Sequence, residues 1–240
     1  MKTTLLILTL NEIDGLEIIM PRIDPNWVDQ ILFVDGNSTD GTIEWINRHE
    51  YELIIQKAPG IRRAYQDALE SIKGDIVITF SPDGNSIPEL IPNLITKISA
   101  GFDMVIVSRY LDGSKSFDDD LLSYLGNKFF TKSINFLYGS HYTDAMVIYR
   151  GYRTNLLKEL EITNDRWYLL VEKIFGAKGL GCEPLISTRA ARRKLRVGEI
   201  KGEEPGRISG TSRVFPNLFV KIRWAFAYYC QILADRFRWK

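Results

Sequence analysis

Short apolar runs alternate along the chain with longer stretches in which apolar residues recur every three or four positions. Runs with the length and composition of buried strands lie at residues 3–10, 27–36, 51–56, 75–80 and 103–110. Stretches with helical spacing lie between them, at residues 38–49, 61–72 and 87–100. Strands that are apolar at nearly every position need cover on both faces, so this order predicts an α/β protein with a mostly parallel sheet.

Polar residues directly follow several of these predicted strands. They are Asn11, Glu12, Asp35, Asp83, Asn85 and Arg109. In open parallel sheets, ligands bind at the carboxyl ends of the strands. The pattern therefore predicts a binding site along that edge of the sheet.

The pattern changes after Tyr110. An acidic loop, a helix, a strand and another helix are predicted at residues 111–120, 121–139, 143–151 and 166–179. The last of these helices carries Glu172 on or near its apolar face. Residues 187–213 hold many Gly, Arg and Lys and few apolar residues, which is typical of a mobile functional loop. Helical spacing returns in the aromatic-rich stretch 215–240.

Composition and charge narrow the class of partner. The 240 residues, 45% of them hydrophobic and 25% charged, are enough to bury a core. The formal net charge is only +1, but residues 189–240 hold 13 Lys and Arg against 4 Asp and Glu. This surplus suggests an anionic partner near the C-terminus. No aromatic residues interleave with the basic ones at 187–213, so we do not expect nucleic acid.

The two cysteines, Cys182 and Cys230, lack the spacing of metal ligands. The first apolar run is too short for a leader peptide, and no run reaches the roughly 18 apolar residues of a membrane span. We therefore expect a reduced, cytoplasmic protein.

Two turns carry candidate chemistry, and each has two interpretations. Asp35 ends a predicted strand, where its carboxylate could accept hydrogen bonds from a nucleobase or a ribose, or could only shape the turn. Asp83 and Asn85 lie in the turn FSPDGNSIPE at residues 80–89. They are ordinary turn residues, or they are oxygen ligands of a hard cation.

A resemblance to a known family bears on this choice. The stretches ILTLNE, FVDGNSTDGT, SPDGNSIPE, VSRY and TDAMVIYRGYR occur in this order between residues 7 and 153. They resemble the motifs IPTYNE, VDDGSxDGT, DADLQHPPE, GSRY and DxxSGFRAYR of glycosyltransferase family 2, whose members have the GT-A fold. The similarity covers roughly residues 4–190 and is greatest to the dolichol-phosphate mannosyltransferase-like subgroup.

The resemblance implies a fold and a domain organisation. The fold would be α/β of the GT-A (Rossmann-like) type, with a central, mostly parallel sheet and helices on both faces. Residues 1–188 would form the nucleotide-sugar transferase domain and 189–215 a basic, mobile active-site loop. Residues 216–240 would form an amphipathic helix that contacts a membrane interface or a second copy of the chain.

The resemblance also implies nucleotide-binding residues. They are Leu8, Thr9, Leu10, Glu12, Asp35, Gly60, Arg63, Ser81 and Pro82. Gly60 would let the chain pass close to the nucleotide. Arg62 stands where the family has a glycine, and either it or Arg63 could reach a phosphate. Gly36 replaces the second Asp of the family pair, so part of that polar contact is missing.

The implied cofactor is Mg²⁺ or Mn²⁺. Asp83 and Asn85 would be the metal ligands, whereas Ser81 replaces the first Asp of the family motif. A site with one carboxylate would hold a metal that arrives with a diphosphate and would bind free metal poorly. In the alternative interpretation, arginines neutralise the diphosphate and no metal is needed.

The implied reaction is an inverting transfer from a UDP- or GDP-sugar, with Asp83, Asp144 and Glu172 as catalytic residues. Asp144 would take the proton of a hydroxyl acceptor, whereas a phosphate acceptor needs no base.

The expected acceptor is a polyprenyl phosphate or a lipid-linked glycan. Arg109, Arg189 and Arg192 would contact it, and the protein would then work at the cytoplasmic membrane surface. The alternatives are transfer to a soluble sugar or a protein hydroxyl, and a nucleotide-sugar-binding module without transfer activity. A nucleotidyltransferase is disfavoured because TLNEIDG, after the first predicted strand, is not a glycine-rich phosphate loop.

Overall fold

The computed structural model of the chain describes residues 1–177, 179–209 and 218–238. Within them, a seven-stranded sheet has the strand order β3-β2-β1-β4-β6-β5-β7. The strands are β1 (Thr3–Thr9), β2 (Gln30–Asp35), β3 (Glu52–Ile55), β4 (Ile76–Phe80), β5 (Met104–Ser108), β6 (Arg150–Arg153) and β7 (Val197–Lys201). Neighbouring strands are parallel, except that β6 runs antiparallel to β4 and β5. The predictions for residues 210–217 and 239–240 lie outside the described residues.

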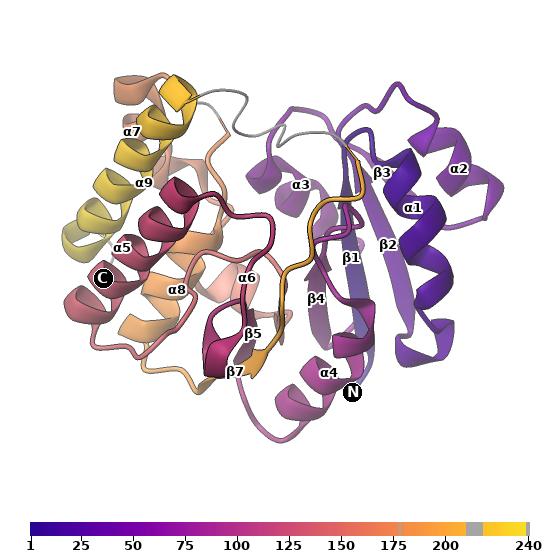
Figure 1. Ribbon diagram of the computed structural model, residues 1–240, viewed down its shortest axis with the longest axis horizontal. Helices are drawn as coiled ribbons and strands as arrows, with labels where there is room; N and C mark the ends of the chain where they lie inside the picture. The colour runs from indigo at the N-terminus through magenta and orange to yellow at the C-terminus, as the bar shows by residue number, and fades with distance from the viewer. Residues whose placement is uncertain (178, 210–217, 239–240) are drawn as a thin grey trace.

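Helices surround this sheet and gather at its two ends (Figure 1). They are α1 (Ile13–Ile19), α2 (Thr42–Arg48), α3 (Ile61–Ala68), α4 (Ile91–Ser99), α5 (Leu121–Tyr138), α6 (Leu156–Glu159), α7 (Leu169–Phe175), α8 (Glu183–Arg192) and α9 (Leu218–Arg238). Short 3-10 turns lie at Met20–Arg22, Pro25–Trp27, Pro88–Leu90, Leu111–Gly113 and Asp165–Trp167. Figure 1 shows α1 and α2 at one end and α5, α7, α8 and α9 at the other. None of the helices in the described ranges combines the length and the apolar character needed to cross a membrane.

The central strands form the core. Every residue of β4 and β5 is buried, and all but one residue of β1. Leu5, Leu6 and Ile7 in β1 have no exposed surface. Because consecutive residues of a strand point to opposite faces, both faces of the sheet are covered. This confirms the α/β class expected from the apolar runs.

The sequence pattern missed one helix and misplaced other elements. Helix α1 was not predicted, because it is short and only one side of it, including Leu16 and Ile19, is buried. The strand expected at 143–151 is wrong in its bounds, since β6 begins at Arg150. The basic loop is also wrong for much of its described part, where α8 continues to Arg192 and β7 follows.

Candidate functional site

The topology brings several polar segments to one edge of the sheet. The carboxyl ends of β1, β2, β4 and β5 meet there because these strands are parallel. Strand β6 runs the other way, so the segment before it, with Asp144, reaches the same edge. Strand β7 is parallel to β5, and the residues after it leave at that edge too. We call residues 202–208 the strap; it rises from β7 across the front of the sheet (Figure 1, orange).

Asp35 holds its own loop together. Its side chain is fully buried, and its Oδ2 accepts hydrogen bonds from Thr9 Oγ1 at 2.7 Å and Ser38 Oγ at 2.6 Å. Its Oδ1 accepts one from the Ser38 backbone N–H at 2.7 Å. Ser38 in turn accepts from the Asn11 N–H at 2.7 Å. The carboxylate therefore joins the ends of β1 and β2, and in this structure it is not open to a nucleobase.

The predicted base-binding residues differ in accessibility. Thr9 is buried against Asp35, Leu8 is half-buried, and Glu12 is largely buried beside Thr42, whose Oγ1 accepts the Glu12 N–H at 2.8 Å. Leu10 is exposed over 41% of its surface. A Cβ at Gly36 would lie 3.2 Å from Leu10 Cδ1 and 3.1 Å from Gln56 Oε1. The glycine that replaces the family Asp thus leaves room for these two side chains.

Asp83 is bound to the strap. Its side chain is nearly buried, and Arg207 Nη1 donates to Asp83 Oδ2 at 2.8 Å. The Ile208 N–H donates to the Asp83 carbonyl at 3.0 Å. Gly84, at φ +96°, also passes close to Ile208, where a Cβ would lie 2.8 Å from Cγ1. Arg207 could not be selected from the sequence pattern, because only the fold brings the strap to this turn.

A second carboxylate joins this contact. Arg207 Nε donates to Asp118 Oδ2 at 3.2 Å, and Asn85 Nδ2 donates to the same oxygen at 3.0 Å. Asp118 belongs to the acidic loop before α5. The guanidinium therefore neutralises two acids that lie 35 positions apart in the sequence.

The oxygens of the Asp83 turn fit a hard cation in part. The hydrogen bond to Asp118 identifies the amide nitrogen of Asn85, and its Oδ1 is buried without a hydrogen-bond partner. With Asp83 and the hydroxyl of Ser81, one short turn offers only oxygen donors, which suits Mg²⁺ or Mn²⁺. No group of three or more His, Cys, Asp or Glu side chains that could hold a metal occurs within the described ranges. The remaining ligands would have to come from a diphosphate.

Asp144 is buried and paired, contrary to the role of an open base. Arg109 Nε donates to its Oδ2 at 2.6 Å, and Arg109 Nη2 to its Oδ1 at 3.1 Å. Asn127 Nδ2 adds a contact at 2.9 Å. Burial alone would raise the pKa of Asp144, but the Arg109 charge and these hydrogen bonds outweigh it and lower the pKa. A carboxylate held in this way orients Arg109 and is a poor proton acceptor.

Glu204 is an acid of the strap that the sequence did not single out. Its carboxylate accepts from Arg109 Nη1 at 3.3 Å and also from Ser116 Oγ. Burial raises the pKa of Glu204 and outweighs the attraction of Arg109. Glu204 N and O also pair with Lys115 O and Phe117 N. The strap is therefore held to the acidic loop by backbone and side chain together.

Glu172 joins two helices. Arg62 Nη1 donates to Glu172 Oε1 at 2.8 Å, and the backbone N–H groups of Gly179 and Leu180 donate to the same oxygen at 3.0 and 3.1 Å. Arg62 is almost fully buried and stacks over the Tyr168 ring at 4.0 Å. These contacts join α3, α7 and the segment before α8, whereas the catalytic role of Glu172 stays a prediction.

The neighbouring residues of α3 are also engaged. Gly60 packs against Gly179, whose Cα would lie 3.0 Å from a Cβ added at Gly60. Its close approach is therefore to the α7–α8 loop. Arg63, about one-third exposed, pairs with Asp165 at 2.6 Å. Its role toward a phosphate stays a prediction.

The two predicted acceptor arginines of α8 hold α9. Arg189 is fully buried, and its Nε and Nη2 donate to Asp235 Oδ1 at 2.9 and 2.7 Å. Arg192 Nη1 donates to the carbonyls of Asp235 and Arg236 at 3.2 and 3.0 Å. Arg189 is therefore not available to a phosphate, which corrects the prediction. Of the three predicted acceptor contacts, Arg109 alone lies at the strand-end edge.

Comparison with known proteins bears on this geometry. Residues 22–161 match the family model described as glycosyl transferase family 2. The chain belongs to glycosyl transferase family 2. The matched residues run from the segment before β2 to the start of the α6–α7 connection, so they contain Asp35, Asp83, Arg109 and Asp144.

Curated relatives of the family match the chain over part of their length. Glycosyltransferase AglJ from Haloferax volcanii is 22% identical over 193 residues, which are 79% of this chain and 58% of that protein. A dolichol-phosphate mannosyltransferase from Pyrococcus furiosus is 33% identical over 125 residues, 48% of this chain and 35% of its own. A dolichyl-phosphate hexose transferase from Haloferax volcanii is 28% identical over 171 residues, 71% of this chain and 68% of its own. The chain thus spans only about a third to two-thirds of these relatives.

Solved structures agree on the fold. Glucosyl-3-phosphoglycerate synthase from Mycobacterium tuberculosis, in complex with UDP, superposes with a TM-score of 0.62 at 17% identity. The match covers 98% of this chain and 80% of that one. A complex of the same enzyme with Mn²⁺, UDP and glucosyl-3-phosphoglycerate gives a TM-score of 0.63 at 16% identity, over 97% and 79% of the two chains. These likenesses confirm the GT-A fold.

Proposed function

We propose that this protein transfers a sugar, with inversion, from a nucleoside-diphosphate sugar to a polyprenyl phosphate. Family membership supports glycosyl transfer, and the names of two relatives identify them as transferases of the dolichol-phosphate type. UDP in a neighbouring structure supports a UDP-sugar as donor, with a GDP-sugar as the alternative. In this proposal, Mg²⁺ or Mn²⁺ is the cofactor.

One observation carries the choice of acceptor. The predicted base, Asp144, is fully buried and bidentate with Arg109, and its pKa is lowered. A hydroxyl acceptor would need a proton acceptor at the site, whereas a phosphate is a nucleophile already. A site whose central acid is neutralised by an arginine therefore suits a phosphate.

The residues at the edge support a mechanism of positioning and charge neutralisation. Arg109 and Arg207 already neutralise carboxylates there, and their forked guanidinium groups can bind phosphate oxygens in pairs. Asp83 and Asn85 would hold the metal ion. When bound with the diphosphate, this ion would neutralise the charge that develops on the leaving nucleoside diphosphate.

A second candidate function is transfer to a hydroxyl group. Glu204 favours it, because burial raises its pKa and it lies next to Arg109 at the same edge. A carboxylate with a raised pKa is better suited to accept a proton near neutral pH.

Nucleotide binding tests the donor side. We expect calorimetry to detect UDP or GDP in the presence of Mn²⁺, with weaker binding in chelator and in the Asp83→Ala variant. Binding that ignores both changes would leave phosphate recognition to the arginines. Failure to bind any nucleoside diphosphate would contradict the proposal.

The acceptor is tested separately. Polyprenyl phosphate and a free alkyl alcohol of the same chain length are offered with the nucleotide sugar that binds. If the Glu204→Gln variant still transfers the sugar to the polyprenyl phosphate, the first function is supported. Transfer to the alcohol that Glu204→Gln abolishes supports the second.

A further inference from the structure

Large exposed apolar side chains gather on three helices. In the described part of the chain, most such side chains belong to α5, α7 and α9, at Leu121, Leu122, Leu125, Phe129, Phe136, Leu169, Leu170, Ile174, Leu218, Phe219, Ile222, Phe226 and Phe237. Soluble monomers rarely expose so many large apolar groups together. We call these side chains the apolar face.

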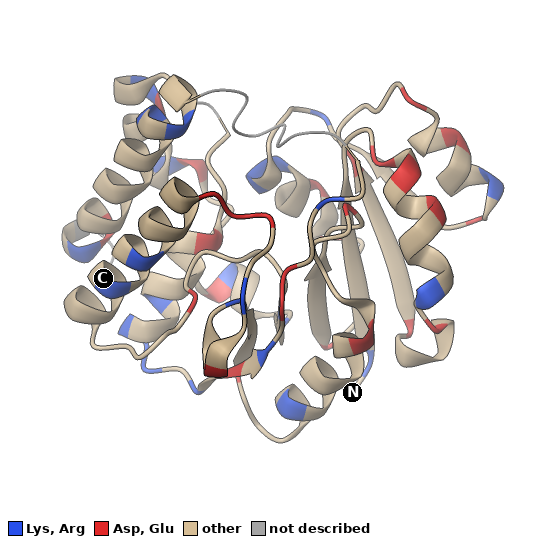
Figure 2. Ribbon diagram, viewed as in Figure 1, with Lys and Arg blue, Asp and Glu red and all other residues tan. Residues whose placement is uncertain are grey.

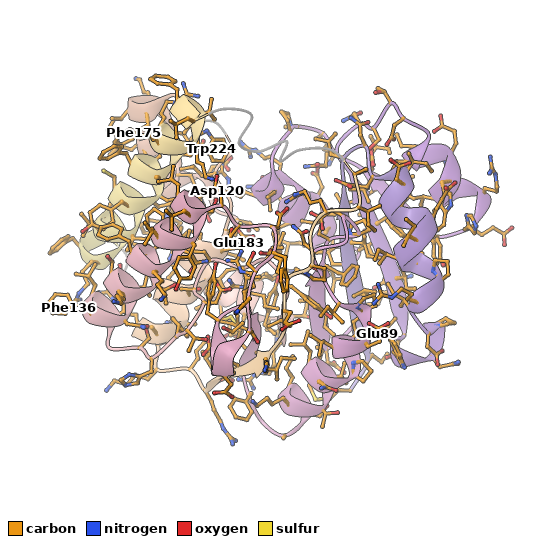
Figure 3. The ribbon with its side chains drawn as sticks, viewed as in Figure 1. Glu89, Asp120, Phe136, Phe175, Glu183 and Trp224 are labelled. Carbon is orange, nitrogen blue, oxygen red and sulfur yellow. The ribbon has the colours of Figure 1, made fainter. Side chains whose placement is uncertain are left out.

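The three helices form one surface. Helix α9 contacts both α5 and α7, and the rings of Phe129 on α5 and Tyr229 on α9 lie 5.1 Å apart. Along α9, the exposed residues Phe219, Ile222 and Phe226 recur every three or four positions, so they lie on one side of the helix. In Figure 3, Phe136 points outward from α5 at the edge of the molecule.

The charges on these helices have one sign where they are accessible. The exposed or half-buried charged side chains in the described parts of α5, α7 and α9 are Lys128, Lys132, Lys173, Lys221, Arg223 and Arg236. The acids of the same helices, Glu172 and Asp235, are buried against Arg62 and Arg189. On the ribbon in Figure 2, the positions of Lys and Arg are distributed over the helices at this end of the molecule.

One acid lies at the border of the apolar face. Asp120 caps α5, and Lys221 binds it at 2.9 Å, which lowers the pKa of Asp120 to about 2. Asp120 is the last residue of the acidic loop, which contacts the strap. The apolar face therefore begins where the candidate site ends.

Charge decides between the possible occupants. A second copy packed symmetrically on this face would place Lys and Arg opposite Lys and Arg, which is unfavourable. An anionic bilayer surface offers acyl chains to the aromatic and aliphatic groups and opposite charge to the cations. We propose that the apolar face binds the surface of an anionic phospholipid membrane, with α5, α7 and α9 lying in the interface. This inference adds a membrane surface as a partner to the proposed function. The link between the apolar face and a lipid acceptor rests on that proposed function.

Vesicle flotation tests the proposal directly. The full chain is mixed with phosphatidylcholine vesicles, with and without phosphatidylglycerol, at low and high salt. We expect binding to the anionic vesicles that weakens with salt and is much weaker on phosphatidylcholine alone. Absence of binding to the anionic vesicles would overturn the proposal.

Matched variants locate the surface. Phe226→Ser should weaken vesicle binding roughly tenfold, whereas Ile18→Ser, at a similarly exposed position on α1, should not. Lys128→Glu with Lys132→Glu should weaken it by about thirtyfold or more, whereas Lys2→Glu with Arg48→Glu, which changes the net charge equally, should have little effect. If a variant and its matched control lose vesicle binding equally, the contact lies elsewhere and the proposal is overturned.

Two further measurements separate the remaining outcomes. Sedimentation without vesicles tests for a dimer. A dimer that Phe226→Ser dissociates, without vesicle binding, would assign the face to a second copy. UDP and GDP binding without vesicles tests the proposed function independently. Vesicle binding without nucleotide binding contradicts only that function, and nucleotide binding without vesicle binding contradicts only this inference.

Discussion

Glu183 illustrates how burial alone changes the chemistry of a residue. It is the first residue of α8, it is almost fully buried, and its Oε1 has no hydrogen-bond partner. Burial raises its pKa above the ordinary value of 4.5. The folded chain therefore holds Glu183 in its protonated form over a wider pH range than the unfolded chain does.

This raised pKa predicts a pH-dependent change in stability. The contribution of Glu183 is fully present below about pH 4.5 and is lost as pH rises toward its folded-state pKa, at about 1.4 kcal/mol per pKa unit. Glu183→Gln should remove this loss. We expect the difference in melting temperature, variant minus wild type, to become more positive from pH 4 to pH 7. A difference that is constant with pH would contradict the raised pKa.

At the scale of elements, α8 is the clearest departure from the sequence pattern. Its segment contains Arg189, Arg192 and Arg193, so it resembles a solvated basic loop. In the fold, eight consecutive residues of α8, from Glu183 to Ala190, are buried. Arg189 tolerates burial because Asp235 on α9 neutralises it and the carbonyls of Leu160 and Glu161 accept from its Nη1. Its partners lie 28 to 46 positions away in the sequence.

The pair between α8 and α9 predicts a stability effect. Asp235→Ala leaves the Arg189 charge buried without its carboxylate and should lower the free energy of unfolding by about 3–5 kcal/mol. Arg189→Met together with Asp235→Leu should lose less, because it leaves no unpaired charge. Urea denaturation of both variants checks this. Equal losses in both would mean that packing, and not the charge pair, joins the helices.

At the scale of the whole molecule, Arg207 connects three distant segments. It lies on the strap after β7 and pairs with Asp83, after β4, and with Asp118, before α5. The guanidinium occupies the only carboxylate of the Asp83 turn, from residue 81 to 86. A cation that binds Asp83 would therefore compete with Arg207. A diphosphate bound nearby would instead be stabilised by the positive charge of Arg207.

These opposing effects predict that Arg207→Ala changes the affinities for metal ion and for nucleotide in opposite directions. Without nucleotide, Mn²⁺ should bind the variant more tightly than the wild type, because Asp83 is freed. In chelator, UDP or GDP should bind more weakly by roughly tenfold or more, the usual range for a lost charge-assisted hydrogen bond. Arg207→Lys is the control that keeps the charge and loses the fork. Calorimetry measures both affinities, and a variant with neither change would exclude Arg207 from the site.

The candidate site was predictable in part. Asp35, Asp83, Arg109 and Asp144 were selected because the carboxyl ends of parallel strands are a general binding position and because their motifs resemble the family. Their hydrogen-bond partners were not predictable. Arg207 and Glu204 lie in the predicted basic loop, where no motif distinguishes them from their neighbours. Arg62, a possible phosphate contact by resemblance, is a buried partner of Glu172.

The sequence by itself determined the α/β class, the buried strands of the sheet and the edge where polar residues collect. These features follow from local patterns, since strand and helix periods and strand-end residues are properties of neighbouring positions. The tertiary structure decided the burial of α8, the antiparallel course of β6 and the pairing of Arg109, Arg189 and Arg207 with distant acids. It also decided that three helices share one apolar face. A charge or an apolar stripe acquires its role from the group it faces, and that group is set by packing between segments far apart in the chain.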